Sequence, residues 1–200
     1  MIILYNNQKE INSAYTEFPD FFMAKEELLA MGYRIISLEE NAKLRMQEGK
    51  YSFVSKNGNW VKEGILYLPK EGKFLTKKSP ILTASKEEVR ADEFYLTEEQ
   101  RESALEDSFR LSDENFSILT KNFGKDDLAI YLFGNSAQDY GDFLKESGIN
   151  KMEIWTTEMK TKPFVRQLWF DKLGVLNGLG KGPHDAYITR GILRNLFSEQ

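Results

Sequence analysis

Residues 163–194 read PFVRQLWFDKLGVLNGLGKGPHDAYITRGILR. This stretch contains an apolar run from Phe164 to Phe170 and leads into a second one from Ile188 to Phe197. Short apolar runs bounded by turn-forming residues are typical of buried strands. Closely spaced glycines separate the two runs, and such spacing marks a loop. The stretch therefore predicts two buried strands that frame a Gly-rich loop.

The composition favours one domain with a single core. The chain has 200 residues, of which 41% are apolar and 13% aromatic, and domains usually run to roughly 100–200 residues. A net charge of −4 without a basic tract is the wrong footprint for nucleic acid. No cysteine is present, which excludes disulfides, thiolate metal sites and cysteine nucleophiles.

The beginning of the sequence, MIILYNNQKE, lacks the pattern of a signal peptide, and no stretch approaches the roughly 20 apolar residues of a membrane span. We expect a cytoplasmic protein by default, or one displayed by another route.

The N-terminal part predicts a strand followed by two helices. The strand is Ile2 to Tyr5, and the first helix runs from Met23 to Met31 before Gly32. Ser37 and Glu40 have the spacing of a capping box, which opens a second helix to about Glu48.

A hairpin is expected next. The runs Tyr51 to Val54 and Trp60 to Leu68 flank an Asn-Gly turn at 57–58, and this dipeptide favours tight hairpins. From Pro69 to Asp92 the sequence has no clear period and predicts a long irregular connection.

The middle of the chain predicts alternating helices and strands. Thr97 and Gln100 form a second capping-box pattern, with a helix to about Arg110, and Ser112 or Asp113 is expected to cap a helix up to Phe123. Then follow a buried strand, an amphipathic helix and another strand, at Leu128 to Phe133, Ser136 to Ser147 and Met152 to Thr156. This βαβ-like order leaves open an alternative function, a nucleotide-binding protein or enzyme that uses the turn Gly134 to Ser136.

Catalytic and metal-binding interpretations find little support in the sequence. The single histidine, His184, adjoins Asp185, but neighbouring loop residues seldom face each other and no nucleophile completes a triad. The GLGKG run at 178–182 fits neither phosphate-binding glycine motif. Acidic pairs such as Glu87-Glu88 sit on neighbouring positions, so a solvated surface is expected. Trp60, Trp155 and Trp169 are expected in the core. We expect no enzyme activity, metal or cofactor.

The frame of residues 163–194 resembles the variable region of proteins diversified by retroelements, in particular archaeal and viral members of the diversity-generating retroelement variable proteins. The matching anchors are Arg166-Gln167-Leu168-Trp169-Phe170, Leu173, Gly178, Leu179 and Arg190-Gly191. Weaker matches are Gly32-Tyr33-Arg34, the strand from Glu63-Gly64 to Pro69, and Ser79-Pro80.

The resemblance implies an α+β, C-type-lectin-like fold in one domain, 1–200, with 163–194 as its variable region. In that fold the terminal strands pair, two helices brace a small sheet, and a loop-rich face binds the ligand. Apolar anchors hold the backbone so that loop side chains can change. The expected anchors are Leu168, Phe170, Leu173, Leu179, Ile192 and Leu193.

The resemblance also implies a binding function for an unknown macromolecular ligand, expected to be a protein. The implied variable, ligand-contacting positions are Asp171, Gly174, Val175, Asn177, Gly180, Gly182, Pro183, His184, Asp185, Tyr187, Ile188 and Thr189. Adenine mutation of asparagine codons cannot produce Lys, Gln, Glu, Met or Trp, and between 171 and 189 these types occur only as Lys172 and Lys181. Small polar residues and Tyr suit adaptable recognition.

Overall fold

The computed structural model describes residues 2–5, 13–17, 20–89, 93–112, 117–178 and 188–193. Its strands are β1 Ile2–Tyr5, β2 Ser13–Glu17, β3 Tyr33–Ile35, β4 Asn59–Leu68, β5 Gly72–Thr76, β6 Phe94–Tyr95, β7 Ser108–Leu111, β8 Ser117–Leu119, β9 Lys151–Trp155, β10 Phe164–Phe170, β11 Val175–Asn177 and β12 Ile188–Leu193. Its helices are α1 Phe21–Ala30, α2 Leu38–Glu48, α3 Phe53–Lys56, α4 Glu98–Leu105, α5 Asp127–Phe133 and α6 Ala137–Glu146, with 3-10 turns η1 Pro80–Leu82, η2 Lys86–Glu88, η3 Thr120–Lys125 and η4 Gly134–Ser136.

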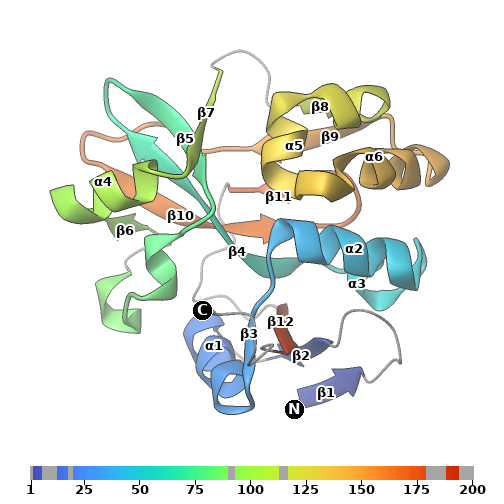
Figure 1. Cartoon of the computed structure of the whole chain (residues 1–200). Coiled ribbons are helices and arrows are strands. Elements are labelled where there is room, and N and C mark those ends of the chain that lie inside the picture. The colour runs from blue at the N-terminus through green and yellow to red at the C-terminus, as the bar shows by residue number, and fades with distance from the viewer. Residues whose placement is uncertain are drawn as a thin grey trace.

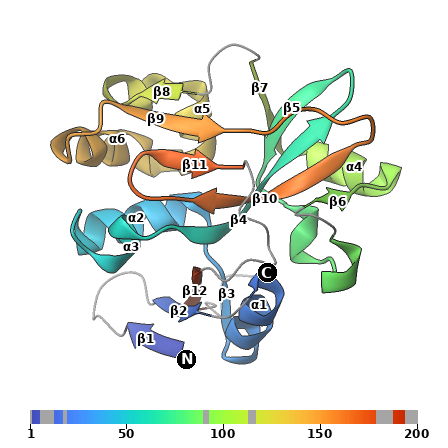
Figure 2. The same ribbon diagram turned by 180° about the vertical axis from the view of Figure 1, so that it is seen from behind.

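One curled sheet joins the described strands in the order β1-β2-β12-β4-β10-β11-β9-β8. The shorter strands β3, β5, β6 and β7 branch from this path. In Figure 1, α2, α5 and α6 lie in front of β9, β10 and β11; Figure 2, from behind, shows these strands with the helices on their far side. Helices therefore cover one face of this part of the sheet.

The terminal strands are neighbours through β2. The first strand, predicted at Ile2 to Tyr5, is confirmed as β1, but it pairs with β2, and β2 in turn pairs with β12. The implied pairing of the terminal strands thus has one strand inserted in it. β12 also runs beside β4, where Thr189 is opposite Trp60.

Both capping boxes expected from the sequence are confirmed. Ser37 and Glu40 form the expected capping box of α2, and Thr97 and Gln100 that of α4. The first predicted helix is α1, which begins after Asp20 because this carboxylate accepts a hydrogen bond from the Met23 amide. The predicted amphipathic helix before Gly148 is α6.

The prediction of a strand at Leu128 to Phe133 was wrong. The segment is helix α5, because the Asp126 carboxylate accepts hydrogen bonds from the amides of Leu128 and Ala129. Gly134 to Ser136 is therefore a 3-10 turn between two helices, and the expected βαβ unit does not form. The alternative nucleotide-binding site rested on a strand ending at this turn. It loses its structural basis.

The predicted hairpin around Asn57-Gly58 was also wrong. Residues 53–56 form α3, and the hairpin partner of β4 is β5, within the segment expected to be irregular. The turn lies at Lys70, which has a φ of 71°. Gly58 serves close packing instead, because a Cβ there would collide with the Trp169 indole.

Two further boundaries differ from the prediction. The helix expected to reach Arg110 ends at Leu105, and β7 follows, paired with β5. The helix expected up to Phe123 is replaced by β8 and a 3-10 turn, because Ser117–Leu119 pairs with β9. Asp113, one of its two proposed caps, lies outside the described residues.

Two apolar clusters fill the described part of the molecule. One lies between the sheet and α2, α5 and α6 and includes the anchors Leu168 and Phe170; the other lies on the opposite face and includes Trp60 and Trp169. Trp155 does not belong to either cluster: 39% of it is exposed, which contradicts the expected core position. Among the described residues, we find no helix with the length and apolar character of a membrane span.

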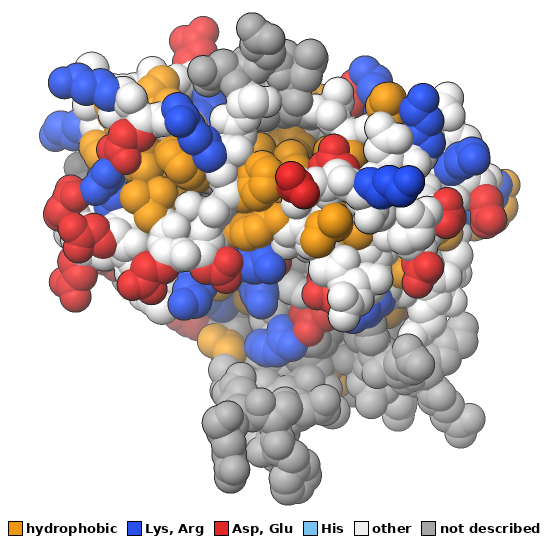
Figure 3. Space-filling view, turned by 45° about the horizontal axis from the view of Figure 1, so that its top comes forward, with side chains coloured by type: hydrophobic (Ala, Val, Ile, Leu, Met, Phe, Trp, Pro, Cys, Tyr) orange, Lys and Arg blue, Asp and Glu red, His pale blue; other side chains and the backbone are white. Residues whose placement is uncertain are grey.

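The surface end at β5, β7, α5 and β8 carries charges of both signs. Figure 3 looks at it obliquely and shows basic (Lys or Arg) and acidic side chains interspersed around exposed apolar side chains. No single sign of charge dominates this face of the described residues.

Candidate ligand-binding surface

The predicted contact stretch leaves β10 at Phe170, turns into β11 and resumes in β12. Asp171, Gly174, Val175 and Asn177 are described in full, and Ile188 and Thr189 are placed by their backbone in β12. The other predicted positions, and the anchor Leu179, lie outside the described residues: Gly180, Gly182, Pro183, His184, Asp185 and Tyr187. The structure therefore shows how the two ends of the stretch are held.

The turn from β10 to β11 is closed by its own backbone. The Asp171 amide donates to the Val175 carbonyl at 3.0 Å, and the Val175 amide donates to the Lys172 carbonyl at 3.3 Å. Gly174 has a φ of +84°, and a Cβ there would lie 2.7 Å from Ile149 Cγ2. This position needs glycine on both counts.

The side chain of Arg45, in α2, also holds this turn. Its guanidinium is fully buried, lies 3.7 Å from the Phe170 ring centroid, and donates from Nη2 to the carbonyls of Phe170 at 3.0 Å and Asp171 at 2.6 Å. Its Nε donates to Asn41 Oδ1 at 2.9 Å. Burial lowers the pKa of Arg45, while Tyr140 and Asp171 oppose that change. An arginine nevertheless stays charged in a protein, so its donors remain in place.

β11 carries two of the predicted positions, and both are largely covered. Val175 pairs with Glu153 and Asn177 with Trp155 in the parallel register of β11 and β9. Only 8% of Val175 and 9% of Asn177 is exposed. A ligand can reach little of either side chain in this arrangement.

Gly178 ends the described part of the stretch and is held at both of its backbone polar groups. Its amide donates to the Trp155 carbonyl at 2.8 Å, and its carbonyl accepts from the Tyr67 hydroxyl at 3.3 Å. The same hydroxyl accepts from the Thr157 amide at 3.1 Å. Burial raises the pKa of Tyr67 to about 12, so this hydroxyl keeps the proton that it donates.

The other end of the stretch is fixed by β12. Ile188 and Thr189 pair with Glu17 and Thr16 of β2, and Gly191 pairs with Ile35 of β3. A Cβ at Gly191 would lie 3.0 Å from the Arg34 carbonyl, so glycine permits the close approach of β3.

Two of the anchors that carry the resemblance, Gln167 and Trp169, hold β10 against β4. The Gln167 side chain is buried at an irregularity in the pairing of β10 with β4. Its Nε2 donates to the carbonyls of Val61 and Glu63, and its Oε1 accepts from Ser79 Oγ at 2.8 Å. Trp169 packs edge-on against Trp60 with 5.1 Å between ring centroids. These contacts keep β10 in one register.

Arg166 pairs with a carboxylate that the sequence analysis did not single out. Glu93 is 1% exposed and accepts from Arg166 Nη2 at 2.8 Å and from Lys160 Nζ at 2.7 Å. Burial raises the pKa of Glu93, but the hydrogen bonds from Lys160 and Arg166 outweigh it and leave that pKa below its ordinary value. This pair ties residues 93 and 160 to β10. A single Glu after an unpatterned stretch gives no sequence signal for such a role.

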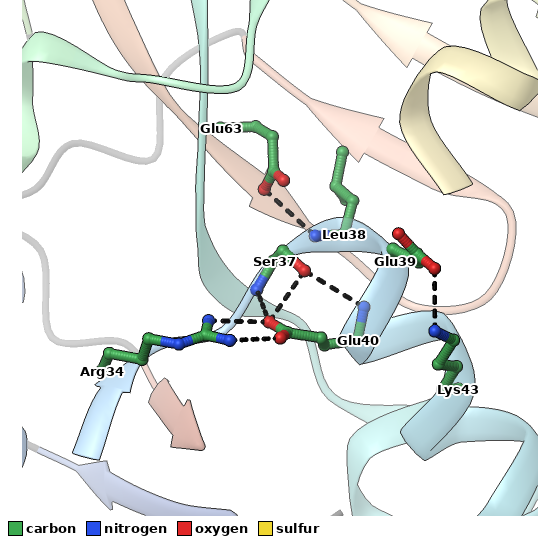
Figure 4. Close-up of polar contacts among 7 residues, drawn as sticks. All are labelled: Arg34, Ser37, Leu38, Glu39, Glu40, Lys43 and Glu63. Carbon is green, nitrogen blue, oxygen red and sulfur yellow. Dashed lines mark hydrogen bonds and ion pairs between the residues drawn. The ribbon is translucent and has the colours of Figure 1, made fainter. Parts of the chain in front are cut away.

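A second buried carboxylate lies at the start of α2. Figure 4 shows Glu63 of β4 pointing at the helix N-terminus, where its Oε2 accepts from the Leu38 amide at 3.1 Å, beside the Ser37–Glu40 capping box and the Arg34–Glu40 ion pair. Burial raises the pKa of Glu63 to about 7. Perturbed carboxyls often mark functional sites. Glu63, however, is only 3% exposed, so it offers no surface to a substrate.

Metal chemistry finds no arrangement to support it in the described ranges. Among those residues, no group of three or more His, Cys, Asp or Glu side chains is placed to hold a metal ion. His184 lies outside them.

No protein-family model and no curated protein matches the sequence. The chain is similar to a solved structure that shows how the C-type lectin fold accommodates massive sequence variation in Nanoarchaeota. The two superpose with a TM-score of 0.67 over 93% of this chain and 98% of that chain, at 15% sequence identity. At this identity the likeness establishes the architecture and transfers no residue role. The chain therefore has the C-type-lectin-like, α+β fold.

Proposed function

We propose that the protein is a non-enzymatic binding protein that contacts a protein ligand through the stretch from Asp171 to Thr189. The observation that carries this proposal is that both ends of residues 179–187 are held by backbone hydrogen bonds. Gly178 is bonded at its amide and its carbonyl, and β12 pairs with three other strands. Side chains between such ends can change without loss of the frame.

The proposed contacts come from Asp171 and from the positions at or beyond Gly180. Gly174, Val175 and Asn177 support the turn and β11 and contribute little exposed area. We further propose that a retroelement diversifies the stretch, as the resemblance implies. The solved Nanoarchaeota structure supports this idea only through its fold, which accommodates massive variation in that protein.

A display selection tests the binding function. Asp171, Gly180, Gly182, Pro183, His184, Asp185 and Tyr187 are randomised together, and the library is selected on ubiquitin, a small probe protein without tryptophan. We expect folded binders whose affinity is lost when the seven positions are returned to the natural sequence. Absence of binders, or unfolding of most library members, contradicts the proposal.

Sequencing of the same gene from sister isolates tests the diversification. We expect substitutions to concentrate between 171 and 189 and to spare Arg166 to Phe170. Substitutions spread evenly along the gene contradict it.

A further inference from the structure

Side chains of β9, the strand next to β11, are exposed on the face where the side chains of β11 are covered. Residues that alternate along a strand point to opposite faces, and paired residues share a face. Val175 and Asn177 therefore lie on the same face as their partners Glu153 and Trp155. The two β11 side chains are at most 9% exposed, whereas Trp155 is 39% exposed. On this face, accessible area comes from β9.

Helices α5 and α6 pack on the other face of β9 and β11. The side chains of β9 and β11 that point the other way, Met152, Ile154 and Leu176, are buried in the cluster with α5 and α6. In Figure 2, β9 and β11 lie in front of these helices. On the opposite face, Trp155 is exposed and Glu153 is half-buried, so β9 offers its side chains to a partner and β11 does not.

The charges on this face neutralise each other. Lys151 Nζ lies 2.6 Å from Glu153 Oε1, and the Trp155 indole nitrogen donates to Glu153 Oε2 at 3.2 Å. The hydrogen bonds from Lys151 and Trp155 also lower the pKa of Glu153. The indole ring remains as the large apolar group, and Trp is one of the residue types enriched among energetically dominant interface residues. Such a surface fits an uncharged, apolar patch of a protein better than a polyanion.

Trp155 is continuous with the proposed contact stretch. Its carbonyl accepts from the Gly178 amide, the last described group before residues 179–187. The backbone of Trp155 therefore adjoins Gly178, after which that segment begins.

We propose that Trp155, bordered by Glu153 and Lys151, is a fixed part of the ligand-contacting surface and docks against an uncharged apolar patch of the protein ligand. This inference rests on the proposed function. It adds an invariant anchor to a surface whose other side chains change.

The test uses the ubiquitin binders described above. Trp155→Ala is introduced into several independently selected binders, with Tyr51→Ala as matched control, since Tyr51 is 75% exposed and belongs to neither β9 nor β11. We expect Trp155→Ala to weaken ubiquitin binding about tenfold or more, equivalent to about 1.4 kcal/mol, and Tyr51→Ala to change it less than twofold. Equal and small effects in most binders overturn the inference while the proposed function stands. A selection without any binder overturns both.

Tryptophan fluorescence gives a second readout in the unmutated binders. Trp60 and Trp169 are 0% and 3% exposed, so acrylamide quenching reports mainly on Trp155. We expect ubiquitin to reduce the quenching. Unchanged quenching overturns the inference, and so does quenching that falls with protein concentration alone, because a second copy of the chain then covers Trp155.

Discussion

The guanidinium of Arg45 stacks on the ring of Phe170 while it donates to the carbonyl of the same residue. One side chain of α2 thus fixes both the ring and the backbone at the end of β10, where the proposed contact stretch begins. The contact ties a helix that is far away in sequence to the turn between β10 and β11.

Replacement of Arg45 should destabilise the protein. Arg45→Met leaves the carbonyls of Phe170 and Asp171 and Asn41 Oδ1 without their donor, and each buried unsatisfied group costs about 1–3 kcal/mol. We expect a loss of about 3 kcal/mol in the free energy of unfolding, measured with urea. Arg45→Lys keeps the positive charge but lacks the forked donor geometry of arginine. Its free energy of unfolding should lie between those of the wild type and Arg45→Met. A loss below about 1 kcal/mol for Arg45→Met would show that Arg45 does not hold the turn.

Gly174 should resist substitution although the resemblance places it among the variable positions. Gly148 provides a matched control, because its φ is +85° against +84° at Gly174, and a Cβ there meets nothing within 4 Å. Gly148→Ala should cost about 1 kcal/mol for the backbone alone. Gly174→Ala also pushes against Ile149 and should cost about 1–3 kcal/mol more. Equal melting temperatures for the two variants would contradict this expectation.

The Tyr67 hydroxyl should stabilise the backbone at Gly178 and Thr157. Tyr67→Phe removes a bond to the Gly178 carbonyl and a bond from the Thr157 amide. We expect a loss of about 1–2 kcal/mol and at least tenfold faster hydrogen exchange at the Thr157 amide. The Asn41 amide, which donates to the Ser37 carbonyl, serves as internal control and should not change. Unchanged exchange at Thr157 would argue against the clamp.

Stability should fall as the pH rises from 4.5 to 7. Burial raises the pKa of Glu63 from 4.5 to about 7 in the folded protein, so the folded state holds a proton that the unfolded state has released over this range. The contribution of this group is fully favourable below pH 4.5 and is lost as the pH passes 7, by about 3 kcal/mol in total. Comparison of melting curves of the wild type and Glu63→Gln isolates it. Wild-type stability should decrease relative to Glu63→Gln between pH 5 and pH 8, and a constant difference would refute the assignment.

Sequence reasoning succeeded where one side chain decides the local structure. Ser37 and Thr97 indicate the starts of α2 and α4, because their hydroxyls accept hydrogen bonds from the first turn of each helix. It failed at Leu128 to Phe133, because six apolar residues fit a buried strand or a buried helix equally well. Asp126, directly before this run, was the unused signal for a helix start.

Only part of the candidate site could be predicted from the sequence. The resemblance located the frame from Arg166 to Phe170, yet the burial of Val175 and Asn177 depends on β9, a partner that local patterns do not identify. The same holds for Arg45 and Glu93, whose partners Phe170 and Arg166 are distant in sequence. Trp155 looked like a core residue because an apolar run does not reveal which face of a strand a helix will cover.

The position of β12 between β2 and β4 has a consequence for biosynthesis. A ribosome releases Ile188–Leu193 after every other described element, so the β1–β2 hairpin cannot join the rest of the sheet before then. Contacts such as Ala14 with Gly191 span almost the whole chain, and pairings of such high sequence separation form slowly. The residues between Gly178 and Ile188 connect β11 to β12, the strand whose pairing joins these two parts of the sheet. A chain in which β12 does not insert leaves edges of β2 and β4 unpaired, and unpaired strand edges make folding intermediates prone to aggregation.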